Sequence, residues 1–227
     1  MNIAIIGTGS VGQAIAGKLS SLGHAVKVGT RDIAATLAKT APDAMGAPAY
    51  AMWAKGHPKV SLGTFAEAAK IGELVINAAS GMGSIAALQS CGSANLAGKI
   101  LIDISNPLDF SQGMPPFLSI VNTDSLGEQI QKAFPQVKVV KTLNVVSAPV
   151  MIDPSCVPGG QPSMFVSGND ATAKTAVSKF LKDWFGWADV LDLGDITTAR
   201  GSEMVLALWV RTWGVVQTPI FGFKVVR

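Results

Sequence analysis

Residues 2–12 read NIAIIGTGSVG, an apolar run followed by glycines in the spacing G-x-G-x-x-G. An amphipathic stretch comes next, and a second apolar run begins at residue 25. This order predicts a strand, a tight turn, a helix and a second strand, as in dinucleotide-binding Rossmann folds. Gly7 allows the sharp turn, Gly9 lets a pyrophosphate approach the backbone, and Gly12 lets the helix pack closely on the strand.

The amides that open the predicted helix have no helical partner and carry the positive end of the helix dipole. A pyrophosphate is therefore their natural ligand. The end of the second strand then decides between NAD and NADP. In folds that prefer NAD, an acid about twenty residues beyond the glycines binds the ribose 2′-hydroxyl.

Thr30 and Arg31 reach that region first, and a hydroxyl and a guanidinium suit a 2′-phosphate. Asp32 stands where an acid of the NAD type could lie. It also precedes a short helix expected at residues 33–39, where it fits an N-cap. We therefore predict NADP, with Arg31 as the residue that discriminates between the two cofactors.

The composition bounds the class of protein. The 227 residues are 48% hydrophobic, enough for one large domain or one domain with a smaller second one. The net charge of +3 is small and the basic residues are scattered, so neither nucleic acid nor a membrane surface is indicated as a partner. No apolar run approaches the roughly eighteen residues of a membrane span.

The first strand begins at Asn2, which leaves no room for a signal peptide. Cys91 and Cys156 form neither a disulfide framework nor a metal-binding pattern. We therefore expect a cytoplasmic protein with reduced thiols and no metal site.

Further apolar runs predict strands at residues 74–78, 100–104 and 137–143, and their near-continuous hydrophobicity is typical of parallel strands covered on both faces. Three helix starts are expected between the strands. Capping boxes indicate two of them, and the residue pairs concerned are Thr64 with Glu67 and Ser125 with Glu128; the third start is placed at Ser84. Residues 42–58 are interpreted as a partly helical insertion.

After Asn144 the composition of the sequence changes, and prolines and a Gly-Gly pair follow. Strands are then expected at residues 164–168 and 189–194, with a helix capped by Asp170 between them and a final helix at about 198–212. We predict an α/β fold with a Rossmann-type parallel sheet in an NADP-binding domain, residues 1–145. A smaller C-terminal α/β domain, residues 146–227, follows.

Ligands of open α/β sheets lie beyond the carboxyl ends of the strands. Small and amide residues follow three of the predicted strands and suit a nicotinamide and its ribose, although such residues are also ordinary in turns. The candidate cofactor contacts at these ends are Ala79, Ser80, Asn106, Pro107 and Asn144.

Side chains that donate protons are scarce. The only tyrosine, Tyr50, has no lysine four residues on, and the two histidines, His24 and His57, fall in a turn and in the insertion. Lys141 is the remaining candidate, but within a strand it is expected to pair with an acid or to extend to solvent. A flavin or deazaflavin acceptor manages its proton through a ring nitrogen and solvent, so it needs none of these groups.

The chain resembles the NADPH-dependent F420 reductase (F420:NADP oxidoreductase) family. The segments that carry the resemblance are GTGSVG at 7–12, LGH at 22–24, VGTRD at 28–32, SNPL at 105–108, VKTLN at 140–144, VMIDP at 150–154 and DLGD at 192–195. The resemblance implies a Rossmann domain, a small C-terminal domain with the acceptor cleft and dimer contacts, and a homodimer. It also implies hydride transfer between NADP and a deazaflavin that lies over the nicotinamide.

Residue by residue, the resemblance places the phosphates on Thr8, Gly9, Ser10 and Val11, and the 2′-phosphate on Thr30 and Arg31. It places Ser80 and Asn106 near the nicotinamide. Asn144 stands where archaeal members tend to carry a histidine, so a flavin, FMN or FAD, is an alternative acceptor to coenzyme F420. The acceptor-side candidates are Asn144, Val145, Met114, Phe117 and the helix around Met204.

The leading hypothesis is an NADPH-dependent oxidoreductase that transfers hydride directly from ring to ring, without a catalytic side chain. A second hypothesis is a sensor that binds NADP(H) without turnover. A third is a reductase of a small carbonyl or imine that uses Lys141 as the proton donor.

Overall fold

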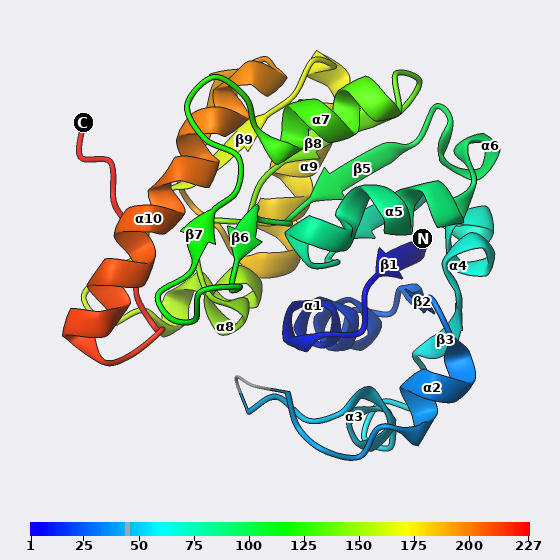
Figure 1. The fold of residues 1–227 in the computed structure, drawn as a ribbon. Helices are drawn as coiled ribbons and strands as arrows, with labels where there is room; N and C mark the ends of the chain where they lie inside the picture. Colours follow the sequence, from blue (N-terminus) through cyan, green and yellow to red (C-terminus); the bar gives the residue numbers. More distant parts are fainter. Residues whose placement is uncertain (44–45) are drawn as a thin grey trace.

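The computed structural model describes residues 1–43 and 46–227, and its sheet begins with the predicted βαβ unit. β1 (Asn2–Ile6), α1 (Ser10–Ser21) and β2 (Ala25–Thr30) follow one another, and β1 and β2 pair in parallel (Figure 1). The expected βαβ unit is confirmed. Residues 44–45, within the predicted insertion, lie outside the described residues.

One mostly parallel sheet of eight strands crosses the described part of the chain, in the order β10-β9-β8-β5-β4-β1-β2-β3. β8 and β9 are antiparallel and share one residue pair, Lys141 with Ser167. The predicted α/β class with a Rossmann-type sheet is thereby confirmed. The remaining strands of the sheet are β3 (Ser61–Thr64), β4 (Leu74–Asn77), β5 (Ile100–Asp103), β8 (Lys138–Lys141), β9 (Met164–Ser167) and β10 (Val190–Gly194).

Helices cover both faces of this sheet, and a two-stranded hairpin, β6 (Leu108–Asp109) with β7 (Phe117–Leu118), stands apart from it. Within the described ranges, no helix is long and apolar enough to cross a membrane. The other helices are α2 (Ile33–Ala38), α3 (Tyr50–Ala54), α4 (Phe65–Ile71), α5 (Gly81–Cys91), α6 (Ser93–Leu96), α7 (Leu126–Ala133), α8 (Ala148–Ile152), α9 (Ala171–Phe185) and α10 (Ala199–Val216), with short 3-10 turns at Pro154–Cys156 and Ile196–Thr198.

The helix starts test the predicted caps. The capping box of Thr64 and Glu67 is confirmed, with both reciprocal hydrogen bonds present. Ser125 caps α7 through the amide of Glu128, but the Glu128 carboxylate accepts from the Ser125 hydroxyl instead of the backbone. The prediction of a helix start at Ser84 was wrong, because α5 already begins at Gly81.

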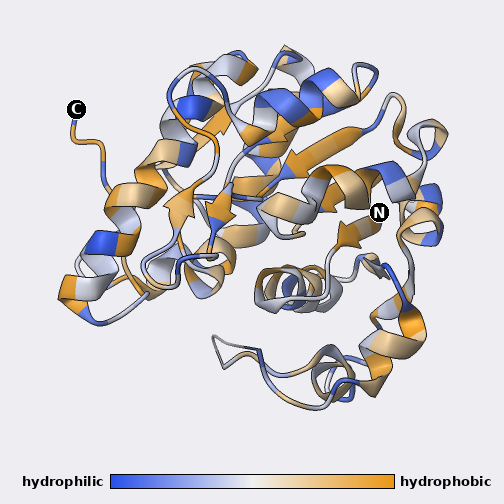
Figure 2. Ribbon diagram, viewed as in Figure 1, coloured by the Kyte–Doolittle hydropathy of each residue, from blue (hydrophilic) through white to orange (hydrophobic). Residues whose placement is uncertain are grey.

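The core lies on both faces of the sheet, and the alternation of side chains along β1 divides it. Ile3 and Ile5 belong to one cluster, with α1, α8 and α9, whereas Ala4 and Ile6 belong to the other, with α4, α5 and α7. Figure 2 shows β1, β5 and β9 among the most hydrophobic elements. The first cluster includes residues on both sides of position 145, so the proposed domain division stays a prediction.

Candidate functional site

The glycine turn between β1 and α1 has the geometry that its spacing predicts. Gly7 has a φ of +121°. A Cβ on Gly12 would stand 2.2 Å from the Gly7 carbonyl oxygen, so the helix approaches the turn too closely for any side chain. A Cβ on Gly9 would meet no atom within 4 Å. The space beside Gly9 is therefore open, as a phosphate requires.

The start of α1 leaves backbone donors free beside that space. Gly9 is the N-cap and provides no side-chain cap. Gln13 N donates to Gly9 O at 2.9 Å, whereas the amides of Ser10, Val11 and Gly12 have no partner in the described part of the chain. Free amides at the positive end of a twelve-residue helix form an anion site that fits a pyrophosphate.

Thr30 and Arg31, the two predicted contacts of the 2′-phosphate at the end of β2, lie in different environments. Thr30 is buried and its hydroxyl lies 2.7 Å from the Thr36 hydroxyl, which itself donates to Asp32 O. Thr30 therefore donates its proton to Thr36. The Asp32 carboxylate accepts from the amide of Ala35, so the predicted N-cap is confirmed. Arg31 is exposed and has no hydrogen bond or ion pair to the described residues, which leaves its guanidinium available for a 2′-phosphate.

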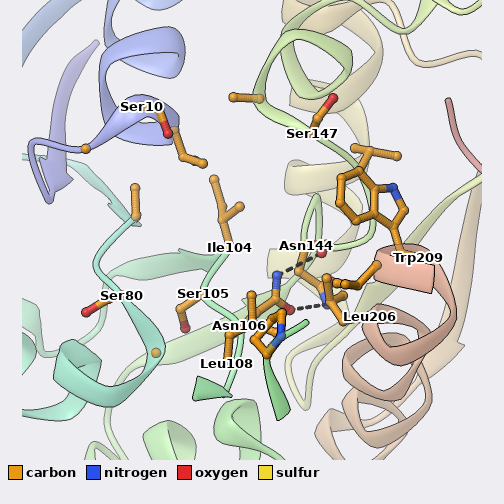
Figure 3. A pocket seen from close by; sticks show the side chains of 18 of the residues that line it. Ser10, Ser80, Ile104, Ser105, Asn106, Leu108, Asn144, Ser147, Leu206 and Trp209 are labelled. Atoms are coloured by element: carbon orange, nitrogen blue, oxygen red, sulfur yellow. Dashed lines mark hydrogen bonds between the residues drawn. The ribbon is translucent and has the colours of Figure 1, made fainter. Parts of the chain in front are cut away.

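A cavity of about 800 Å³ extends from the glycine turn to α10. Figure 3 shows Ser10 and Ser80 on one side of it, Leu206 and Trp209 on the opposite side, and Asn106 and Asn144 between them. The α10 residues that line it, Leu206, Trp209, Val210 and Trp213, share one helical face. The cavity therefore has a narrow polar floor and an apolar wall.

Two asparagine side chains hold the floor together. Asn144 Nδ2 donates to Asn106 Oδ1 at 3.0 Å and to Ser202 O at 3.1 Å, and Asn106 Nδ2 donates to Asn144 O at 2.9 Å. Both protons of the Asn144 amide are thus used, so Asn144 can offer a ligand only its carbonyl oxygen. Leu143, just before it, is buried with a φ of +61°, a strained conformation that this turn imposes.

The structure places the predicted residues unevenly around the cavity. The predicted contacts that line it are Gly9, Ser10, Val11, Ala79, Ser80, Asn106, Asn144 and Met114. Gly7 and Gly12 shape the glycine turn but do not line the cavity, Thr8 O accepts a hydrogen bond from Gln13, and Pro107 packs near Gly81. Val145 lies in the core, whereas Phe117 and Met204 are exposed outside the lining. The four wall residues of α10 were anticipated only as a helix, although their i, i+3, i+4, i+7 spacing could have identified them.

Known proteins resemble this chain in sequence and in fold. Residues 2–107 match the family model described as NADP oxidoreductase, coenzyme F420-dependent. The crystal structure of a proposed F420-dependent NADP reductase from Arthrobacter sp. FB24 has a TM-score of 0.95 and 57% sequence identity, over 100% of both chains. The chain belongs to the F420-dependent NADP oxidoreductase family. It is accordingly an NADP-dependent oxidoreductase.

More distant structures share only the fold. A hypothetical protein from Sinorhizobium meliloti has a TM-score of 0.60 and 23% identity, over 87% of each chain. An imine reductase from Myxococcus stipitatus in complex with NADP+ has a TM-score of 0.62 and 14% identity, over 96% of this chain and 63% of that one. No curated protein matches the sequence significantly.

In this member of the F420-dependent NADP oxidoreductase family, Lys141 lies beneath the cavity floor and outside its lining. Its ammonium is fully buried and contacts Asp103 Oδ2 at 2.8 Å, Glu203 Oε1 at 2.9 Å and the carbonyl oxygen of Ser105. Burial alone would lower the pKa of Lys141, but the carboxylates of Asp103 and Glu203 raise it above its usual value. Lys141 therefore pairs with acids, as its position in a strand suggested, and all three protons are used.

The other proton-donating candidates lie away from the cavity of this F420-dependent NADP oxidoreductase. His24 packs on Trp184, and His57 stacks on Trp53 with ring centroids 4.1 Å apart. Tyr50 is buried in the insertion, and this burial raises its pKa to about 12. Among the described residues, none that lines the 800 Å³ cavity has an ionisable side chain.

Proposed function

We propose that this protein transfers hydride between NADPH and a planar tricyclic acceptor, a deazaflavin such as coenzyme F420 or a flavin. The observation that carries the proposal is the long cavity with the glycine turn at one side, an apolar aromatic wall at the other and no ionisable side chain among its described lining residues. The family and the similar Arthrobacter protein support the same acceptor class.

The residues that line the cavity suit the positioning of the two reactants and not the transfer of a proton, because none of the described ones has an ionisable side chain. NADPH supplies the hydride, and the acceptor ring supplies both the atom that receives it and a nitrogen that takes a proton from solvent. The residues of the chain bind the two partners, orient them and exclude water. Free amides at α1 and the guanidinium of Arg31 would hold the phosphates of NADP, Ser80 and Asn106 would contact its nicotinamide half, and Trp209 would flank the acceptor ring.

Stopped-flow mixing of the NADPH-loaded protein with coenzyme F420, FMN or FAD tests the proposal. We expect loss of NADPH absorbance together with reduction of at least one acceptor. Leu206→Trp, which fills the apolar wall, is expected to slow this reaction at least tenfold and to leave NADPH affinity within about twofold. Leu208→Trp, on the exposed side of the same helix, is the matched control and is expected to react normally.

Tight NADPH binding without oxidation by any of these acceptors would contradict the proposal and favour the sensor hypothesis. The same preparation tests the donor side, because Arg31→Ala is expected to lower the preference for NADPH over NADH. The reductase hypothesis based on Lys141 lacks support, since the ammonium has no free proton and does not line the cavity. The homodimer and the cytoplasmic location expected from the sequence stay predictions.

A further inference from the structure

We propose that Arg211 binds an anionic arm of the hydride acceptor, so that the preferred acceptor is a planar ring carrying a short chain that ends in phosphate or carboxylate. The inference rests on the proposed function and names the substrate class of the same site. A second cavity beside the first carries it.

The second cavity has a volume of about 460 Å³ and lies at the far end of α10. Met114, Val210 and Trp213 line both this cavity and the larger one. The two spaces therefore adjoin, and a ligand held in the first can extend into the second. The loop between β6 and β7 contributes Met114 and Pro115 to the lining of the second cavity, and β7 contacts α10.

The spacing of the lining residues along α10 places Arg211 next to the wall of the larger cavity. Leu206, Trp209, Val210 and Trp213 form the wall of the larger cavity, and the next part of the surface, Val210, Arg211, Gly214 and Gln217, lines the second. From Leu206 to Arg211 the helix rises about 7.5 Å. A ring that lies against the wall would thus place a short substituent beside the guanidinium.

The charges around the two cavities favour an anion at this point. Arg211 is the one charged side chain that lines either cavity in the described ranges, and it has no hydrogen bond or ion pair with the described residues. The Gln217 amide donates one of its two protons to Gly214 O and keeps one donor for a ligand. A Cβ on Gly214 would meet no atom within 4 Å, so the space there is open.

The guanidinium is the group that such a ligand requires. The C-terminal end of a helix carries partial negative charge, so the backbone of α10 does not attract an anion there. Arginine stays charged at all relevant pH values and presents paired donors that match phosphate or carboxylate oxygens. A neutral arm would accept only weaker hydrogen bonds, without the charge attraction and the paired geometry.

FMN and riboflavin test the inference, because they share one ring and differ by a terminal phosphate. Binding of each oxidised flavin to the NADP+-loaded protein is measured by flavin fluorescence, independently of turnover. We expect wild type to bind FMN about tenfold or more tightly than riboflavin, and salt to weaken only FMN binding. Arg211→Gln is expected to reduce this preference to about twofold or less, with riboflavin affinity unchanged.

Two control variants separate a specific contact from a change in overall charge. Arg211→Lys keeps the charge without the forked donors and is expected to keep part of the preference. Lys179→Gln removes an exposed charge on α9, away from both cavities, and is expected to keep all of it. NADPH affinity is expected to be the same in every variant.

Equal binding of FMN and riboflavin by wild type, or an unchanged preference in Arg211→Gln, would overturn the inference. Where neither flavin binds, coenzyme F420 and its chromophore without the anionic arm are the second pair, and failure of both pairs to bind overturns it as well. A preference for the anionic ligand without NADPH oxidation would support the role of Arg211 and contradict the proposed function.

Discussion

Lys138 and Lys141 lie on the same strand, β8, in opposite environments. Lys141 and its partner Asp103 are completely buried, and Glu203 closes the group by also accepting from the amides of Leu126 and Gly127 at 2.8 and 3.0 Å. Lys138 forms an ion pair with Asp170 in which the side chains are 40% and 32% exposed. Removing a partner from a buried pair leaves uncompensated charge, whereas solvent screens the exposed pair.

We expect Lys141→Met to lower the free energy of unfolding by about 3–5 kcal/mol, and Lys138→Met to lower it by less than about 1 kcal/mol. Urea unfolding followed by circular dichroism measures both. The raised pKa also sets a sign: the stabilisation from Lys141 is fully present below the ordinary lysine value of 10.5 and is lost as pH rises through the folded-state pKa. Similar losses in the two variants would show that the buried group stabilises no more than a surface pair.

At this scale the sequence predicts residue types better than partners. Asn106 and Asn144 were recognisable as amides at strand ends, but their mutual hydrogen bonds join positions 38 residues apart. Glu203 gave no local signal, because its role depends on α10 reaching the start of α7, 76 residues earlier in the chain. Such pairs are set by the packing of the whole sheet and helices, so no local pattern contains them.

At the scale of the element, Gly9 and Gly12 separate binding from packing within one turn. Gly9→Ala adds a methyl group to the open space beside the free amides, whereas Gly12→Ala forces that group against the Gly7 carbonyl. We expect Gly9→Ala to weaken NADPH binding at least tenfold at a cost of under about 1 kcal/mol in stability. Gly12→Ala is expected to cost about 1–3 kcal/mol.

NADPH titration and urea unfolding of both variants measure these effects. An NADPH affinity in Gly9→Ala equal to that of wild type would argue against phosphate binding at this turn.

Elements with strong local signals were predictable, since apolar runs predicted β4, β5 and β8 close to their observed bounds. β3 was missed because SLGT lacks an apolar run, and its pairing with β2 depends on the neighbouring strand.

At the scale of the whole molecule, one core crosses the predicted domain boundary. The cluster that contains Ile3 and Ile15 also contains Val150, Val177 and Trp187. We therefore expect residues 1–145 and 146–227 to unfold together, because separating the two segments would expose the apolar surface that each one buries against the other. Calorimetry and far-UV circular dichroism of the protein without cofactor are expected to give one coincident transition, and two resolved transitions would favour independent domains.

The two sides of the larger cavity come from different parts of the sequence. The glycine turn, the end of β4 and the loop after β5 come from residues up to about 110, of which residues 2–107 match the family model. The opposite wall comes from α8 and α10, after residue 144. Under the proposed function, substitutions of the α10 residues that face the cavity would change the acceptor side, while the glycine turn on the NADP side stays the same. In evolutionary terms, relatives that differ at this wall would then reduce different oxidants with the same source of reducing power.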